Sequence, residues 1–99
     1  MKAGYVVFIR EGEITDPAAM AAYQSGAGGG ADPDMKVHTV YGAIETIEGE
    51  AADGIVILEF PSVQRARDWY YGEYNEKAKL RQKAAPYRGF IVEGFAMPS

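Results

Sequence analysis

His38 and Glu59 are the two residues best suited to moving a proton. His38 is the only histidine in the chain, and an imidazole is the side chain that ordinarily exchanges a proton near neutral pH. Glu59 ends an apolar run, where a carboxyl group can act as an acid or a base. Both are candidate catalytic residues. The alternative for His38 is a polar strand residue at a rim or an interface, because a single histidine lacks a triad or a ligand set.

Arg81 is a candidate for binding a negatively charged substrate. It falls on the inner face of a predicted helix, on the same side as Tyr74 and Ala78. An inward arginine must be paired, because burying an unpaired charge is costly. The partner would be a substrate carboxylate, which a guanidinium binds well. The structural alternative is a salt bridge to Glu59 or Glu93.

A second set of candidate substrate-binding residues is aromatic and consists of Tyr23, Tyr41 and Trp69. The predicted helices and the second strand converge where these rings would lie, so together they could wall an aromatic cavity. The chain has seven tyrosines and a single tryptophan. Large rings also bury well against a sheet, so ordinary core packing is the alternative.

Composition excludes several classes of function. With no cysteine there is no thiol nucleophile and no thiolate metal site, and one histidine with dispersed carboxylates does not form a zinc or iron site. We therefore expect no metal and no cofactor, and nothing in the sequence favours haem. A net charge of −4 without a basic stripe argues against nucleic acid. No apolar run approaches the roughly 20 residues of a membrane span, and no signal peptide is expected, so a cytoplasmic protein is predicted.

The elements that would position these residues follow one another as β-α-β-β-α-β. Asp16 before Pro17 predicts the start of the first helix, and Ser62 predicts the start of the second. Gly72 is expected to end or bend that second helix through a left-handed residue, and Gly42 to form a bulge or a bend. A glycine-rich segment, residues 25–34, is either a lid over a pocket or a plain connection. The expected strands are residues 5–9, 35–41 with a continuation at 43–48, 55–60 and 90–95; the expected helical pieces are residues 17–23, 63–71 and 74–85. Alternation along residues 35–41 is expected to put Met35, Val37, Thr39 and Tyr41 on one side of the strand and Lys36, His38 and Val40 on the other.

This order predicts an α+β, ferredoxin-like fold in a single domain spanning residues 1–99. Its four-stranded antiparallel sheet carries both helices on one face. The first and third strands are nevertheless apolar on both faces, so the bare face must also be covered. A second copy of the chain is the simplest cover, and we expect a homodimer that packs through its sheet faces.

A strand-to-helix motif with aromatic residues after it resembles domain of unknown function 1330. The motif is Glu59-Phe60-Pro61-Ser62, Ala66, Trp69-Tyr70, Glu73-Tyr74 and Arg81; weaker matches are Asp16-Pro17, Tyr23, Tyr41-Gly42, Glu48-Gly49 and Val92-Glu93-Gly94. The resemblance implies the dimeric α/β-barrel superfamily, in which each subunit has a pocket between helices and sheet. Relatives there include small monooxygenases, isomerases and haem-dependent enzymes.

Two functions follow from these residues. The first is a dimeric binding or structural protein that holds a small molecule between helices and sheet. The second is a small cofactor-independent enzyme, similar to a monooxygenase or an isomerase, that acts on an aromatic or carboxylate metabolite. In the enzyme, His38 or Glu59 would transfer the proton and Arg81 would orient the substrate.

Overall fold

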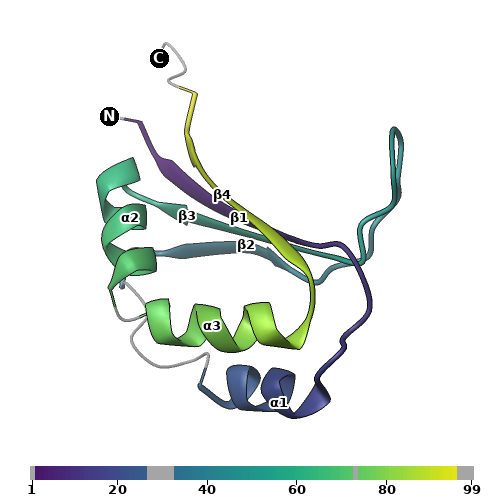
Figure 1. Ribbon diagram of the computed structural model, residues 1–99. Helices are drawn as coiled ribbons and strands as arrows, with labels where there is room; N and C mark the ends of the chain where they lie inside the picture. Colours follow the sequence, from purple (N-terminus) through teal and green to yellow (C-terminus); the bar gives the residue numbers. More distant parts are fainter. Residues whose placement is uncertain (1, 27–32, 73, 96–99) are drawn as a thin grey trace.

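The computed structural model describes residues 2–26, 33–72 and 74–95, and within them the chain forms four strands and three helices (Figure 1). In chain order these are β1 (Gly4–Arg10), α1 (Pro17–Gly26), β2 (Lys36–Val40), β3 (Gly54–Phe60), α2 (Val63–Tyr71), α3 (Tyr74–Ala84) and β4 (Tyr87–Glu93). The strands form one antiparallel sheet in the order β2-β3-β1-β4. The predicted ferredoxin-like architecture is confirmed, with the second helix divided in two.

Capping residues and one glycine set the helix boundaries, as the sequence predicts. Asp16 Oδ1 accepts a hydrogen bond from Ala19 N at 3.0 Å, and Ser62 Oγ accepts one from Arg65 N at 3.1 Å. Each bond satisfies a backbone donor that the first helical turn leaves open. Gly72 follows α2 with a φ of −93°, so the left-handed conformation expected there is wrong. A Cβ at this position would nevertheless come within 2.5 Å of the Asp68 carbonyl oxygen. Only glycine fits this turn, which separates α2 from α3.

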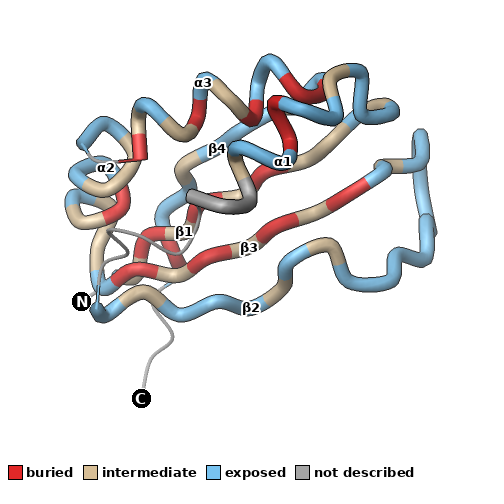
Figure 2. The backbone as a smooth tube through the Cα atoms, turned by 90° about the horizontal axis from the view of Figure 1, so that it is seen from below, coloured by how far each residue is buried: buried red, intermediate tan, exposed pale blue. Residues whose placement is uncertain are grey.

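The three helices lie on one face of the sheet (Figure 1). α2 packs directly against β1, β3 and β4, whereas α1 packs against α3. The core between helices and sheet is formed by alternate residues of the two central strands, which Figure 2 shows as a red and tan alternation. Its members are Val6, Phe8, Val56, Leu58 and Phe60, joined by Ala66, Tyr74 and Ala78 from the helices.

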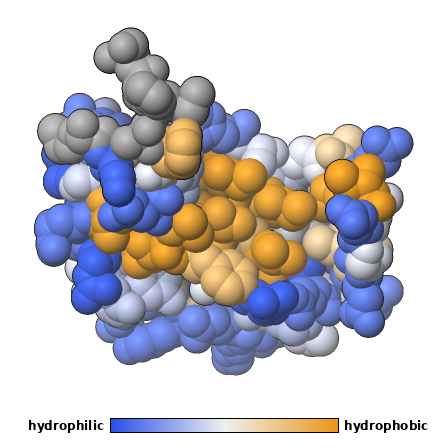
Figure 3. All heavy atoms as spheres, turned by 90° about the horizontal axis from the view of Figure 1, so that it is seen from above, coloured by the Kyte–Doolittle hydropathy of each residue, from blue (hydrophilic) through white to orange (hydrophobic). Residues whose placement is uncertain are grey.

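The opposite face of the sheet is apolar and carries no helix. The strand registers place on it the half-buried residues Tyr5, Val7, Ile9, Ile55 and Ile57 and the exposed residues Phe90 and Val92. Figure 3 views the molecule from this side and shows a continuous hydrophobic area with a hydrophilic border. We call this surface the open sheet face.

The second strand is shorter than predicted. Residues 43–48 do not continue it, because Tyr41 adopts a positive φ of 53° that turns the chain out of the sheet. The irregularity expected at Gly42 instead falls between Val37 and Thr39. Val37 and Val40 consequently share the helix-covered face, whereas Thr39 faces the other way. The expected alternation of Val37 with Thr39 and Tyr41 is therefore wrong.

Two further boundaries differ from expectation. β4 begins at Tyr87 rather than at residue 90, because Tyr87 to Gly89 pair with the end of β1. α1 continues to Gly26, so the glycine-rich segment begins later than predicted. Residues 27–32 lie outside the described part of the chain, and the lid hypothesis with them.

Candidate functional site

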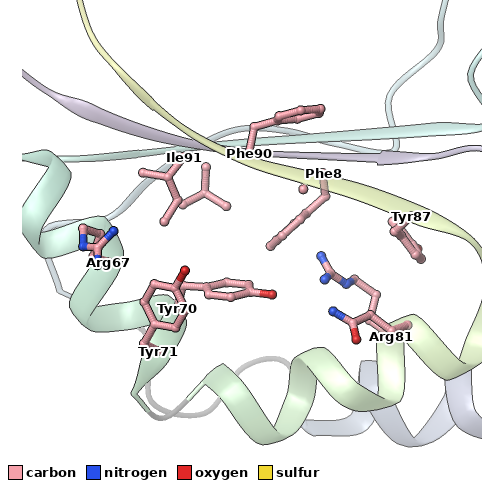
Figure 4. A pocket seen from close by; sticks show the side chains of 11 residues that line it. Phe8, Arg67, Tyr70, Tyr71, Arg81, Tyr87, Phe90 and Ile91 are labelled. Carbon is pink, nitrogen blue, oxygen red and sulfur yellow. The ribbon is translucent and has the colours of Figure 1, made fainter.

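A cavity of about 370 Å³ lies between α2, α3 and the β1–β4 half of the sheet. It is lined by Val6, Phe8, Arg67, Tyr70, Tyr71, Arg81, Gln82, Tyr87, Gly89, Phe90 and Ile91. Figure 4 shows Arg81 rising from α3 toward Phe8, with Tyr70, Tyr71 and Arg67 on the α2 side. We call this space the arginine cavity. Its volume falls within the range of about 300–1,000 Å³ typical of small-molecule sites.

Arg81 is the most unusual residue of this cavity. It is only 2% exposed, and its Nε and Nη1 atoms are buried without a hydrogen-bond partner in the described part of the chain. Its guanidinium carbon lies 3.8 Å from the centre of the Phe8 ring and 5.0 Å from that of Tyr87. These aromatic faces stabilise the positive charge but accept none of its N–H bonds. Arg81 therefore offers unused donors at the wall of a cavity.

The salt bridges that the sequence suggested for Arg81 do not form. Glu59 accepts a hydrogen bond from His38, and Glu93 pairs with Lys2 at 3.1 Å. Glu59 lies opposite Tyr5 on the open sheet face, so the sheet separates it from Arg81. The charge of Arg81 thus remains available to a ligand.

A second cavity, of about 290 Å³, lies on the other side of Phe8, under α1 and the β2–β3 half of the sheet. Its walls are mostly hydrocarbon and are formed by Phe8, Tyr23, Met35, Val37, Val40, Tyr41, Val56, Leu58, Trp69 and Tyr74. We call it the aromatic cavity. The structure brings Tyr23, Tyr41 and Trp69 together here, as the sequence suggested, and places Arg81 in the neighbouring cavity. Their role in binding substrate stays a prediction.

Two pairs of tyrosine hydroxyls connect the elements around the cavities. Tyr23 of α1 and Tyr74 of α3 are 2.6 Å apart at their oxygens, and the oxygens of Tyr41 and Tyr87 are 2.5 Å apart. Burial, above all, raises the pKa of Tyr23, Tyr41 and Tyr74 above the ordinary value of 10.0; for Tyr41 and Tyr74 the hydrogen bond to the partner hydroxyl adds to this effect. These hydroxyls therefore remain neutral at physiological pH.

His38 and Glu59 lie together on the open sheet face. His38 Nε2 and Glu59 Oε1 are 2.8 Å apart, and the imidazole lies 6.3 Å from the Tyr5 ring. Neither residue lines the arginine cavity or the aromatic cavity. His38 lies in the bulge of β2, between Val37 and Thr39, where the strand register shifts. The pair would reach a substrate only on the open sheet face, and its catalytic role stays a prediction.

Several lining residues were not among the predicted site residues. Arg67, Tyr70 and Tyr71 of α2 line the arginine cavity. Their spacing of three and four residues puts them on neighbouring parts of one helix surface, which is the signal that could have grouped them. Tyr87 alternates with Gly89 and Ile91 along β4, so a period of two would have placed it beside the helices.

Within the described residues, no group of three or more histidine, aspartate or glutamate side chains is arranged to hold a metal ion. The helices in the same part of the chain are all too short or too polar to cross a membrane.

Comparison with known proteins identifies the family and supports the fold. No curated protein matches the chain. A crystal structure of a protein of unknown function from Rhodopseudomonas palustris is similar in fold, with a TM-score of 0.62 and 22% sequence identity over 97% of this chain and 84% of that one. The model of the family described as "Domain of unknown function (DUF1330)" matches residues 3–95. The chain therefore belongs to the DUF1330 family.

Proposed function

We propose that the chain binds a small aromatic carboxylate in the arginine cavity. The observation that carries this proposal is the burial of Arg81 with two of its nitrogen atoms unpaired at the cavity wall. An unpaired buried charge is costly, and a bound anion would remove most of that cost. The ligand would supply the partner that the described part of the chain lacks.

The charge and lining of the cavity support a carboxylate in particular. One buried guanidinium matches one negative charge, which favours a carboxylate over a phosphate dianion, and guanidinium geometry suits a planar carboxylate. Phe8, Tyr70, Tyr71 and Tyr87 surround the space with aromatic surface, which suits a ring on the ligand. Arg67 lies on an exposed part of α2 and would attract an anion to the cavity.

We further propose that a second copy of the chain covers the open sheet face. This face is built from seven apolar or aromatic residues of three strands, and an isologous contact buries the same patch on both copies. His38 and Glu59 would then lie at the dimer interface. The enzymatic alternative would place a substrate there, whereas the arginine cavity and the aromatic cavity lie on the opposite side of the sheet.

Calorimetric titration with benzoate tests the proposed binding. Benzyl alcohol, a neutral analogue of similar size, is the control ligand. Benzoate should bind the unaltered protein more tightly than benzyl alcohol does, and Arg81→Met should weaken benzoate binding by about tenfold or more, because a hydrogen bond to a charged group contributes about 1.5–3 kcal/mol. Arg81→Lys should retain part of the affinity, since it keeps the charge without the planar donor group.

His38→Ala is the matched control from the other side of the sheet and should leave benzoate binding unchanged. Equal binding of benzoate by Arg81→Met and the unaltered protein would overturn the proposal. The proposal would also be overturned if His38→Ala lost benzoate binding while its folding and its mass in solution stayed unchanged. That result would place the benzoate site on the open sheet face.

A further inference from the structure

The aromatic cavity differs from the arginine cavity in its chemistry. None of its ten lining residues is charged. Five of them are aromatic: Phe8, Tyr23, Tyr41, Trp69 and Tyr74. An apolar cavity of 150 Å³ is large enough to bind benzene, so about 290 Å³ is ample for a substituted single ring. A carboxylate entering this space would find aromatic faces, which repel a negative charge.

Among the described residues, the Tyr23–Tyr74 pair leaves one hydrogen-bond donor unused in this cavity. Each phenol carries one O–H donor, and the bond between the two oxygens, 2.6 Å apart, uses only one of the two hydrogens. Both tyrosines line the aromatic cavity. The remaining O–H can therefore donate to a ligand oxygen, and the paired oxygens retain lone pairs that can accept from one. Since burial raises the pKa of Tyr23 and Tyr74, the donors stay protonated.

Access to the cavity runs past the edge strand. Val37 and Val40 of β2 line the cavity and are each 55% exposed. β2 is the outermost strand on this side of the sheet. A small molecule can therefore reach the cavity beside these two valines without displacing the buried core residues Val56 and Leu58.

We propose that the aromatic cavity is a second binding site, distinct from the arginine cavity, and that it takes a neutral single-ring aromatic molecule carrying one hydroxyl group. Phe8 lines both cavities and separates them. The chain would thus bind two classes of ring, with Arg81 selecting the anion and the tyrosine hydroxyls selecting the phenol.

Trp69 provides a direct measurement, because it is the only tryptophan and lines this cavity. Its fluorescence would be followed during titration with 4-methylphenol, with toluene as the matched ring that lacks the hydroxyl. Saturable binding is expected, with 4-methylphenol about fivefold tighter than toluene, the factor that one net hydrogen bond gives. Changing Tyr23 and Tyr74 together to phenylalanine should bring the two affinities together, because either hydroxyl alone would still offer one free O–H to the ligand. Absence of a saturable change with either ring would overturn the proposal.

Two variants separate this site from the arginine cavity. Val40→Phe fills the aromatic cavity from the edge strand, where an aromatic side chain is well tolerated, and should abolish 4-methylphenol binding while calorimetry still detects benzoate. Arg81→Met should do the reverse. Val37→Phe repeats the test if Val40→Phe does not fold. Retention of 4-methylphenol binding in the folded filling variant, or its loss in Arg81→Met, would overturn the second site without bearing on the benzoate result.

Discussion

The guanidinium carbon of Arg81 lies 3.8 Å from the centre of the Phe8 ring, inside the core between helices and sheet. A cation over an aromatic face gains about 0.5–2 kcal/mol. Removing the charge from water costs several kcal/mol unless hydrogen bonds compensate. Two of the guanidinium nitrogens are unpaired within the described residues, so the cost exceeds the gain until an anion binds.

Arg81→Met should therefore stabilise the unliganded protein. Methionine keeps much of the length of the side chain and its contact with Phe8 but removes the buried charge, so the free energy of unfolding should rise by about 1 kcal/mol. Urea denaturation without added carboxylate measures it. Arg67→Met, at an exposed position of α2, is the control and should change stability by less than about 0.5 kcal/mol. A loss of stability in Arg81→Met would mean that the aromatic contacts outweigh desolvation.

Phe90→Lys should separate the proposed homodimer. Phe90 is 39% exposed on the open sheet face, and a lysine within an apolar contact would be buried without a partner. Light scattering should give twice the chain mass of 10.8 kDa for the unaltered protein and 10.8 kDa for the variant. The control is Ile14→Lys, because Ile14 is similarly exposed, at 40%, but lies in the connection between β1 and α1. This variant should leave the mass unchanged. A monomeric unaltered protein at micromolar concentration would refute the dimer.

Stability should fall at alkaline pH because one buried and two partly buried phenols are held protonated. The pKa values of Tyr23, Tyr41 and Tyr74 are raised above 10.0, first of all by burial. Above about pH 10 the unfolded chain loses these protons while the folded chain keeps them, so the free energy of unfolding decreases as pH rises. Below that pH both states are protonated and these groups contribute no pH dependence. Thermal unfolding between about pH 8 and pH 11 would measure the decrease.

Tyr41→Phe and Tyr74→Phe should each make that alkaline decrease shallower. Tyr71→Phe removes the hydroxyl of an exposed tyrosine and is the matched control. If stability fell as steeply with rising pH in both variants as in the unaltered protein, these hydroxyls would not be the groups responsible.

The Tyr41–Tyr87 pair should show coupling in a double-mutant cycle. Tyr41 follows β2 at one edge of the sheet and Tyr87 begins β4 at the other, so their hydroxyl bond joins the two edge strands across β3 and β1. Each change to phenylalanine should destabilise by about 1 kcal/mol, and the double change should cost less than the sum by a similar amount. Additive effects would show that the hydrogen bond contributes nothing in solution.

The order of the main elements and the start of the first two helices were readable from the sequence because they depend on local chemistry. The apolar runs of β1 and β3, the caps Asp16 and Ser62 and the turn at Gly72 each act within a few neighbouring residues. The caps Asp16 and Ser62 are also among the residues that carry the family resemblance. The inward position of Arg81 followed from helical spacing alone, which is also local.

Only the tertiary structure decided which side chains meet. The positive φ of Tyr41 and the bulge between Val37 and Thr39 depend on strand pairing, and the bulge removes the expected alternation of Val37 with Thr39. The sheet itself then divides the predicted residues: His38 and Glu59 lie on one face, and Arg81 lies on the other among Phe8, Tyr70 and Tyr87. Charged groups on opposite faces of a sheet cannot pair, however suitable their spacing along the chain. Arg81 therefore remains open to a ligand.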